Sequence, residues 1–297
     1  MRYVLITGVS TGIGYATAKY LQEKGFFIFG SVRKKEDAER LETTFGENFK
    51  ALVFDVTDET AILASVEKVE AIVGKEGLFG LVNNAGIAVA GPLQYLEMKA
   101  FEHQINVNVF GLMRLTQAFL PLLGAGVKYK SSPGRIVNIG SVSGIVSTPF
   151  VGAYAASKYA VEAISDALRR ELFIHGIDVV LLQPGPIKTP IWQKGIQIEE
   201  RYLKTEYSPM LKQMEKGAKK AEATAIDPVL IGKLIYKALT LKRPAARYLI
   251  SPNKWSTLLA SKLPDKWLDR IFFKGMKKAL KYDATKNSGS IRKNKNS

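Results

Sequence analysis

Residues 3–14 read Tyr-Val-Leu-Ile-Thr-Gly-Val-Ser-Thr-Gly-Ile-Gly, an apolar run followed by three closely spaced glycines. The run has the composition of a buried β-strand, and the segment after it has a helical period up to Gly25. A strand that passes through a glycine-rich turn into a helix presents the unpaired N–H groups of the helix N-terminus to a phosphate. Gly8 permits the tight turn, and Gly12 and Gly14 permit close backbone approach. This stretch predicts a dinucleotide-binding α/β fold.

Short β-rich runs alternate with longer helical segments along the rest of the chain. We expect seven strands, over residues 3–7, 26–31, 51–54, 78–83, 135–140, 177–183 and 247–251. The helices between them are expected over residues 12–24, 35–45, 58–73, 97–123 and 152–175, most of them closed by a glycine. Strand–helix repeats with right-handed crossovers build a doubly wound parallel sheet with helices on both faces. Residues 1–251 are therefore expected to form one domain.

The composition limits the chemistry that the chain can perform. It has 297 residues, 46% of them hydrophobic, and no cysteine. Such a chain fits a soluble globular protein with a large core, and disulfides, thiolate nucleophiles and cysteine-based metal sites are excluded. The strand pattern begins at residue 2 and no apolar run could span a bilayer, so neither a signal peptide nor a transmembrane helix is expected. We predict a cytoplasmic protein.

The positive charge is concentrated at the C-terminal end. Residues 242–297 hold 15 Lys or Arg and 3 Asp or Glu, whereas residues 1–241 are nearly balanced. A basic end favours an anionic surface or partner, which makes peripheral contact with an anionic membrane a hypothesis. The fold pattern is not one of nucleic-acid binding, so no nucleic-acid partner is predicted. Residues 286–297 lack an apolar period and are expected to be a disordered tail.

A tyrosine four residues before a lysine places both side chains on one helical face, one turn apart. The chain has five such pairs, beginning at Tyr15, Tyr20, Tyr95, Tyr154 and Tyr282. Only Tyr154 has a serine thirteen residues upstream, Ser141, which follows an apolar strand that ends in a glycine-rich turn. We interpret the other four as surface pairs and take Ser141, Tyr154 and Lys158 as the candidate catalytic set.

These three side chains can move a proton beside a nicotinamide ring. A phenol titrates too high to act as a base near neutral pH, but the Lys158 ammonium and an oxidised nicotinamide would favour the phenolate. Tyr154 would take the alcohol proton as hydride leaves, or give a proton to the carbonyl in reverse. Ser141 would orient the substrate oxygen, and Lys158 would also hold the nicotinamide ribose. No metal is needed, and His103 and His175 are isolated and interpreted as structural.

The end of the second strand distinguishes NADP from NAD. An acidic residue at that place would hold the adenosine ribose of NAD. The sequence instead reads Gly30-Ser31-Val32-Arg33, with no acid before Glu36. Arg33 could pair with a 2′-phosphate, and Ser31 and Ser10 could hydrogen-bond to it. We predict NADP as the cofactor, with NAD as the second choice.

The motifs resemble those of the short-chain dehydrogenase/reductase family over roughly residues 1–251. Four occur in the family's order: TGxxxGIG at residues 7–14, Asn83-Asn84-Ala85-Gly86, Ser141 with Tyr154 and Lys158, and Pro184-Gly185. The resemblance implies a single Rossmann-type domain with a seven-stranded parallel sheet, forming a homodimer or homotetramer through its two long helices. It also implies hydride transfer between NAD(P) and a hydroxyl or carbonyl group.

By the same resemblance, further residues have roles at the site. Asn108 would be a fourth catalytic residue, whose backbone holds a water in a proton relay from Lys158. The glycine turn would contact the cofactor through Gly8, Ser10, Thr11, Gly12, Ile13 and Gly14. The adenine would be contacted by Asp55 and Val56, and the adenosine ribose by Asn84, Ala85 and Gly86. The nicotinamide would be contacted by Pro184, Gly185, Ile187 and Thr189.

The length and the C-terminal end look like those of family members that act on retinoids, steroids and other hydrophobic alcohols or ketones. Residues 190–226 follow the Pro-Gly motif and are expected to form a substrate lid carrying Trp192, Tyr202 and Tyr207. These large side chains either favour a bulky apolar substrate or only dock the lid onto the body.

A helical extension over residues 252–285 carries two apolar stripes separated by Pro264. They are Trp255, Leu258, Leu259 and Leu263, then Trp267, Leu268, Ile271, Phe272, Met276 and Leu280. A lid over the substrate cleft, an interfacial membrane anchor and simple packing on the body are three interpretations.

A non-catalytic NADP-binding sensor on the same fold is the alternative to an enzyme. The complete Asn108, Ser141, Tyr154 and Lys158 set argues against a sensor, because a sensor does not need a proton relay.

Overall fold

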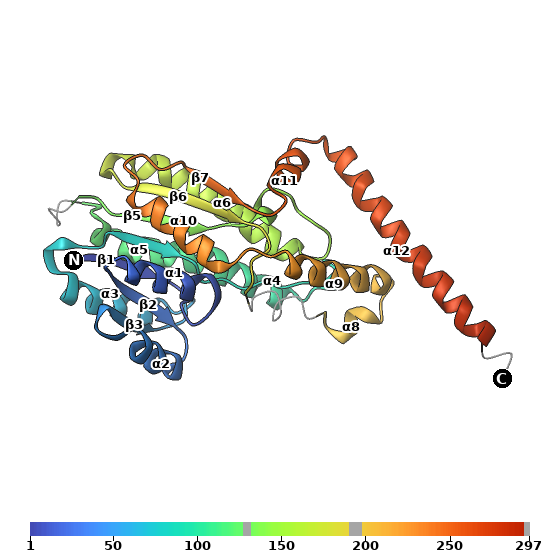
Figure 1. The fold of residues 1–297 in the computed structure, drawn as a ribbon, viewed down its shortest axis with the longest axis horizontal. Helices are drawn as coiled ribbons and strands as arrows, with labels where there is room; N and C mark the ends of the chain where they lie inside the picture. The colour runs from blue at the N-terminus through green and yellow to red at the C-terminus, as the bar shows by residue number, and fades with distance from the viewer. Residues whose placement is uncertain (127–131, 190–197, 294–297) are drawn as a thin grey trace.

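The computed structural model describes residues 1–126, 132–189 and 198–293, with side chains up to Leu280 (Figure 1). Seven parallel strands form one sheet in the order β3-β2-β1-β4-β5-β6-β7. They are β1 (Arg2–Ile6), β2 (Phe26–Val32), β3 (Phe49–Val53), β4 (Gly80–Asn83), β5 (Arg135–Ile139), β6 (Asp178–Pro184) and β7 (Arg247–Ile250). The predicted doubly wound sheet is confirmed. The strand order reverses between β1 and β4, where a crevice forms at the carboxyl ends of such strands.

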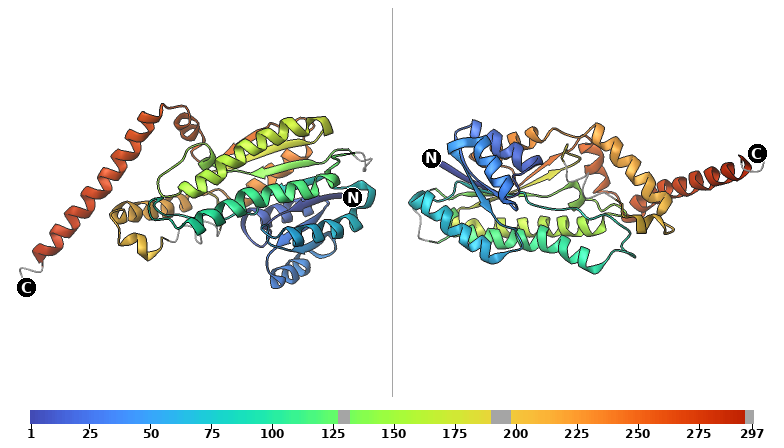
Figure 2. Two further views of the ribbon diagram at one scale, coloured as in Figure 1. Left: turned by 180° about the vertical axis from the view of Figure 1, so that it is seen from behind. Right: turned by 90° about the horizontal axis from the view of Figure 1, so that it is seen from below.

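Helices cover both faces of this sheet (Figures 1 and 2). Val4 and Ile6 point to one face, and Leu5 between them points to the other, as the two-residue period of a strand requires. The first face is covered by α1 (Gly12–Glu23), α2 (Lys35–Phe45) and α10 (Pro228–Thr240). The second is covered by α3 (Glu59–Val73), α5 (Gly111–Phe119) and α6 (Gly152–Glu171). The two apolar cores are continuous along the sheet, so the carboxyl ends of the strands are held in fixed register.

The helix predicted over residues 97–123 is interrupted in the structure. It consists of α4 (Met98–Ile105), a π-helical segment η3 (Asn106–Phe110), α5 and a short 3₁₀ turn η4 (Pro121–Leu123). Gly111 begins α5 against Val56, where an added Cβ would lie 2.7 Å from Val56 Cγ2. The sequence has an uninterrupted helical period here, so the π turn is imposed by tertiary contacts, which centre on Asn108.

The C-terminal part of the chain carries further helices before and after β7. It contains α8 (Glu200–Leu203), α9 (Ser208–Ala223), α11 (Lys254–Ala260) and α12 (Asp265–Lys293), which extends away from the body as an arm (Figures 1 and 2). The sequence predicted a disordered tail from residue 286, but α12 continues through Lys293. A helix that is already nucleated gains one hydrogen bond per added residue and needs no apolar period to continue. In the described ranges, no helix is both long and apolar enough to cross a membrane.

Exposed apolar side chains lie on the outer surfaces of η3 and α6. Phe110 is 53% exposed, and Phe173 and Ile174, in the 3₁₀ turn that follows α6, are each 81% exposed. The homodimer or homotetramer implied by the family resemblance would cover this surface, and it stays a prediction.

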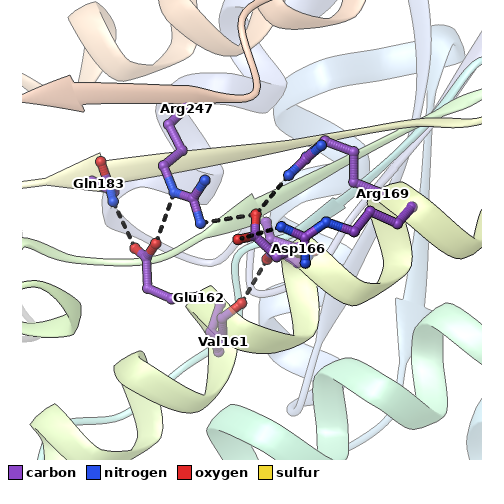
Figure 3. Close-up of polar contacts among 9 residues, drawn as sticks. Val161, Glu162, Asp166, Arg169, Gln183 and Arg247 are labelled. Atoms are coloured by element: carbon purple, nitrogen blue, oxygen red, sulfur yellow. Dashed lines mark hydrogen bonds and ion pairs between the residues drawn. The ribbon is translucent and has the colours of Figure 1, made fainter.

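A charged network attaches α6 to the last two strands (Figure 3). Glu162 accepts hydrogen bonds from Gln183 of β6 at 2.8 Å and from Nε of Arg247 of β7 at 3.0 Å. Arg247 also pairs with Asp166 at 2.9 Å, and Arg169 pairs with the same carboxylate at 2.9 Å. The Arg247 hydrogen bond, opposed by partial burial and aided by Arg169, lowers the pKa of Asp166 to about 2. The network therefore sets the position of α6 relative to the sheet.

We predict that Arg247→Met destabilises the fold by about 2 kcal/mol at pH 7, because it removes the cation that two partly buried carboxylates share. The depressed pKa of Asp166 stabilises the fold above its unfolded value near 4, and this contribution is lost as the pH falls from about 4 to about 2. The variant should therefore lose less stability than the parent over that range. Urea unfolding at several pH values measures both effects.

Lys204→Met is the matched control, because it breaks the exposed Lys204–Glu200 pair, whose side chains are 75% and 84% exposed. It should change the stability by less than about 0.5 kcal/mol. Equal effects of the two substitutions would contradict a structural role for the Arg247 network.

Candidate active site

The turn between β1 and α1 is shaped to receive an anion. Gly8 and Gly12 have positive φ angles of 71° and 62°. A Cβ on Gly14 would lie 2.2 Å from the carbonyl oxygen of Gly8 and 2.6 Å from Nδ2 of Asn84, so only glycine fits there. Thr11 precedes α1 without a side-chain cap, and the first turn has no acidic residue. The N–H groups at the start of α1 are therefore left for a phosphate.

Thr7 and Asn84 join β1 to β4 beside this turn. The buried Thr7 hydroxyl accepts hydrogen bonds from the N–H groups of Asn84 and Ala85 at 3.0 and 2.9 Å. Asn84 Nδ2 donates to the carbonyl oxygens of Thr7 and Gly8 at 2.8 and 3.1 Å. The Gly8 N–H donates to Ser31 Oγ at 3.1 Å. Asn84 and Ser31, both predicted as cofactor contacts, thus also hold the glycine turn in place.

One guanidinium group contacts Ser10, and a second lies at the end of β2. Arg33 is exposed at the end of β2, and Arg40 of α2 donates to the Ser10 carbonyl oxygen at 3.2 Å and to Asp37 at 2.7 Å. Partial burial raises the pKa of Asp55, but hydrogen bonds from Thr57 and the charge of Arg33 outweigh it, so this pKa lies below its usual value. Arg40 was not in the predicted set, although a basic residue on the helix after β2 would have been a signal for it.

Ser141, Tyr154 and Lys158 come together at the carboxyl end of β5. Ser141 precedes the 3₁₀ turn η5 (Val142–Gly144), and α6 carries the other two one turn apart. Tyr154 makes a side-chain hydrogen bond with Ser141, and Lys158 Nζ lies 5.7 Å from the centre of the Tyr154 ring. The three residues are 3%, 7% and 7% exposed. The structure thus assembles the set that the spacing predicted.

Burial controls the protonation of this set. It raises the pKa of the Tyr154 phenol, against the opposing effect of the Ser141 hydrogen bond. It lowers the pKa of Lys158 to about 8, and Nζ donates to the Ile139 carbonyl oxygen at 2.8 Å. At pH 7 the phenol is neutral and the amine is mostly charged. The lowering of the tyrosine pKa predicted from the sequence required the nicotinamide charge as well, and the protein's own groups do not produce it.

Asn108 connects the segment after β4 to α6 from within the π turn. Its Oδ1 accepts from the Ile87 N–H at 2.9 Å, and its Nδ2 donates to the Ile87 carbonyl oxygen and to Ser157 Oγ, both at 3.0 Å. Ser157 in turn donates to the Tyr154 carbonyl oxygen at 2.7 Å. A Cβ on Gly86 would lie 3.2 Å from Asn108 Oδ1. Asn108, which the family resemblance predicted, and Ser157, which the sequence did not single out, therefore position the backbone of Tyr154. The water relay stays a prediction.

The residues after β6 are held against β7. The N–H of Gly185 donates to the Ile250 carbonyl oxygen at 2.8 Å, directly after Pro184. Ile187 is buried and pairs with Ile226 in an isolated bridge, which joins the two ends of the predicted lid. Of the remaining predicted contacts, Ile13 and Val56 pack on the two apolar cores, and the Thr189 hydroxyl donates to the Ile187 carbonyl oxygen at 3.5 Å. Their contact with a cofactor stays a prediction.

The lid side chains dock onto the segment after β4. Tyr202 is fully buried, and a Cβ on Gly91 would lie 2.7 Å from its Cε2. Tyr207 donates to Gln94 at 2.9 Å, and its ring centre lies 5.7 Å from that of Phe150. These contacts support the docking interpretation of both tyrosines, and substrate contact stays a prediction. Trp192 lies outside the described residues.

A hollow of about 260 Å³ lies between the start of α12 and the segment that leads into α6. Its apolar lining includes Leu93, Phe150, Leu268, Phe272, Phe273 and Met276. Among the described residues, Phe150 is the one non-glycine residue with a positive φ, 69°, and its carbonyl oxygen accepts from the Gly91 N–H at 2.7 Å. Such strain in a bulky residue is typical of functional segments. No group of three or more His, Asp or Glu residues in the described part of the chain could hold a metal ion.

Comparisons with known proteins agree with this geometry. The family model for short chain dehydrogenases matches residues 2–199. The NADPH-dependent 3-dehydrocapnine reductase of Ornithobacterium rhinotracheale is 44% identical over 279 residues, which cover 94% of this chain and 98% of that protein. Retinol dehydrogenase 16 of Mus musculus is 33% identical, over 83% of this chain and 80% of its own. A short-chain dehydrogenase structure from Streptomyces avermitilis has a TM-score of 0.73 at 25% identity, with 98% and 97% of the two chains covered.

We predict that Lys158→Met makes the fold about 1–2 kcal/mol more stable at pH 7, because it removes a buried charge. The folded-state pKa near 8 lies below the ordinary value of 10.5, so the unfolded chain binds more protons between these values. The parent's stability therefore rises with pH across that window. The advantage of the variant should be full below pH 8 and should shrink toward pH 10.5. Urea unfolding across this pH range measures it.

Lys233→Met removes an exposed lysine of α10 and serves as the control, with no pH-dependent gain expected. A constant difference between Lys158→Met and the parent from pH 7 to pH 10.5 would contradict the depressed lysine pKa.

Proposed function

Because the chain belongs to the short-chain dehydrogenase family, we propose that it uses NADPH to reduce the carbonyl group of a hydrophobic ketone or aldehyde. The family establishes an NAD(P)-dependent oxidoreductase. The assignment of the proton donor rests on one observation above all: Tyr154 is buried, which raises the pKa of its phenol, and it is hydrogen-bonded to Ser141. A neutral phenol is a proton donor, which is what a carbonyl oxygen needs as hydride arrives at its carbon.

The chain's own residues divide the work of this reduction. The bound nicotinamide cofactor supplies the hydride. Ser141 and Tyr154 hydrogen-bond to the substrate oxygen and polarise the carbonyl, and Tyr154 then gives its phenolic proton to that oxygen. The Lys158 ammonium lies on the same helical face and stabilises the phenolate that remains. Asn108 and Ser157 hold the backbone of Tyr154, so the proton donor keeps its position.

The cradle for the cofactor favours NADP over NAD. The glycine turn and the start of α1 would hold the pyrophosphate, as the exclusion of any Cβ at Gly14 supports. No carboxylate ends β2, and Arg33 at the end of that strand and Arg40 beside Ser10 would pair with a 2′-phosphate. The relative from Ornithobacterium rhinotracheale is named as NADPH-dependent, which supports the same choice.

The apolar hollow supports a hydrophobic substrate. It adjoins the strained Phe150, four residues before Tyr154, and α12 supplies its other wall. Apolar surface of this kind favours a substrate with a hydrocarbon portion. Two relatives have names that fit: one reduces a 3-dehydro compound, and another is a retinol dehydrogenase. We propose a compound that carries its carbonyl near an extended apolar group.

We predict that Tyr154→Phe lowers the rate of ketone-dependent NADPH oxidation by about 10²–10⁴-fold, because it removes the proton donor. NADPH binding, followed by fluorescence, should change little. The substrates would be a panel of hydrophobic ketones and aldehydes, with NADH alongside.

Tyr20→Phe is the matched control, because Tyr20 also precedes a lysine by four residues but lies against Tyr236 on the opposite face of the sheet. It should keep full activity. Tight NADPH binding with no turnover of any carbonyl by the parent would support a sensor instead.

We predict that Arg33→Asp combined with Arg40→Gln raises the KM for NADPH by about 10–100-fold, because two charge-assisted contacts to the 2′-phosphate are lost. The KM for NADH should change little, since NADH lacks that phosphate. Lys75→Asp is the control: it also replaces a cation by a carboxylate, but at the amino ends of the strands, and it should change neither the KM for NADPH nor the KM for NADH. An unchanged cofactor ratio in the double variant would contradict the NADP assignment.

A further inference from the structure

The body covers only part of the apolar face of α12. Leu268, Phe272, Met276 and Ala279 follow spacings of four, four and three, so they lie on one side of the helix. That side borders the hollow and α9, and Ala279 is only 7% exposed. The large apolar side chains on its two flanks are left in solvent: Trp267 61%, Ile271 59%, Phe273 55% and Leu280 46% exposed.

The remaining side of α12 is cationic. Lys266, Arg270, Lys274 and Lys277 follow spacings of four, four and three, and all are exposed. Trp267, Ile271, Lys274 and Lys278 share a neighbouring side, so aromatic, aliphatic and ammonium groups alternate along one exposed surface. Residues 254–280 hold seven Lys or Arg and two Asp. This arm therefore combines exposed apolar groups with a positive charge excess.

The preceding helix repeats the pattern. Trp255 and Leu259 lie one turn apart on α11 and are 79% and 66% exposed. The ammonium group of Lys254 lies 5.8 Å from the centre of the Trp255 ring. Two consecutive helices thus each present a tryptophan, an aliphatic side chain and at least one lysine to solvent, on a part of the chain that projects from the body (Figures 1 and 2).

We propose that α11 and α12 form an interfacial anchor, which binds the surface of a membrane that contains anionic lipid. The indole rings and aliphatic side chains enter the boundary between headgroups and acyl chains, and the lysines reach back to the lipid phosphates. Each Lys or Arg near such a surface contributes about 1 kcal/mol. The exposed apolar groups and the basic ones therefore act on the same partner.

The positive charge and the exposed apolar groups of α11 and α12 together favour an anionic bilayer over a second copy of the chain or a nucleic acid. A second copy of the chain would bring the same positive face against itself, which disfavours self-association through α12. A nucleic acid would neutralise the charge but would leave the two tryptophans and their aliphatic neighbours without apolar contact. An anionic bilayer meets both requirements.

The test is flotation of the intact protein with vesicles of phosphatidylcholine alone or mixed with phosphatidylglycerol, at low and high salt. We expect binding to the anionic vesicles that weakens with salt, and little binding to phosphatidylcholine. Lys274→Gln with Lys278→Gln should lower the partition coefficient about thirtyfold, the equivalent of two lysines. Trp267→Ser with Ile271→Ser should lower it as well but leave its salt dependence unchanged, because the lysines remain.

Matched controls use α3 and the 3₁₀ turn η2 (Gly74–Glu76) that follows it. Lys68→Gln with Lys75→Gln removes two exposed lysines, and Leu63→Ser with Ile72→Ser removes two exposed aliphatic groups that are 52% and 42% exposed. Neither pair should change binding. Thermal unfolding would show that the α12 variants stay folded, which is expected because the substituted side chains are exposed.

Three results would overturn the proposal. One is the absence of binding by the parent to anionic vesicles at low salt. Another is equal loss in the α3 and α12 variants. The third is a dimer, measured by sedimentation velocity, that Trp267→Ser with Ile271→Ser dissociates, since that would identify α12 as a contact between copies. None of these readouts depends on turnover, so failure of the anchor is distinguishable from failure of the reductase.

Discussion

The site depends on the hydrogen bonds that join β1 to β4 at their carboxyl ends. Parallel strands whose order reverses there leave a crevice, but the crevice has a fixed shape only if the loops leaving the two strands are tied together. Thr7 and Asn84 make that connection with four hydrogen bonds, all between 2.8 and 3.1 Å. They fix the carbonyl oxygens of Thr7 and Gly8, so these acceptors are already paired. The N–H groups that face a phosphate are consequently arranged before any ligand arrives.

A chain of buried hydrogen bonds connects β4, beside the glycine turn, to α6, which holds Tyr154 and Lys158. Asn83 Nδ2 donates to Thr116 Oγ1 at 3.0 Å and to Asn138 Oδ1 at 2.9 Å, and Asn138 donates to Ser165 of α6 at 2.9 Å. All four residues are at most 4% exposed. In a low dielectric such bonds are strong and directional, so they set how α6 lies on β5. On its other side, the Arg247 network holds α6 to β7. These two networks together fix the position of α6 and therefore of Tyr154 and Lys158.

Features that repeat along the chain were predictable from the sequence, whereas features made by distant partners were not. The strands, the glycine turn and the spacing of Ser141, Tyr154 and Lys158 are local patterns, and the structure agrees with them. The π turn around Asn108 has no local signal, because it is produced by contacts with Ile87 and Ser157 that lie far away in sequence. Arg40 differs: its place on the helix after β2 is a local signal, but its contact with the Ser10 carbonyl oxygen forms only once α2 packs beside the turn. The domain limits and the cofactor contacts remain predictions.

Two features near the Ser141, Tyr154 and Lys158 set lower the stability of the fold: a buried ammonium group and a strained backbone conformation. Lys158 is buried with a carbonyl oxygen as its hydrogen-bond acceptor, and burial pulls its pKa down to about 8. Phe150 adopts a left-handed conformation that costs a bulky residue of the order of 1–3 kcal/mol. Both lie on α6 or on the segment entering it, the element that the polar chain and the Arg247 network hold most firmly. A strained, charged segment persists only when its surroundings determine its position, so the firm attachment of α6 is what allows an ammonium group and a neutral phenol to stay buried side by side.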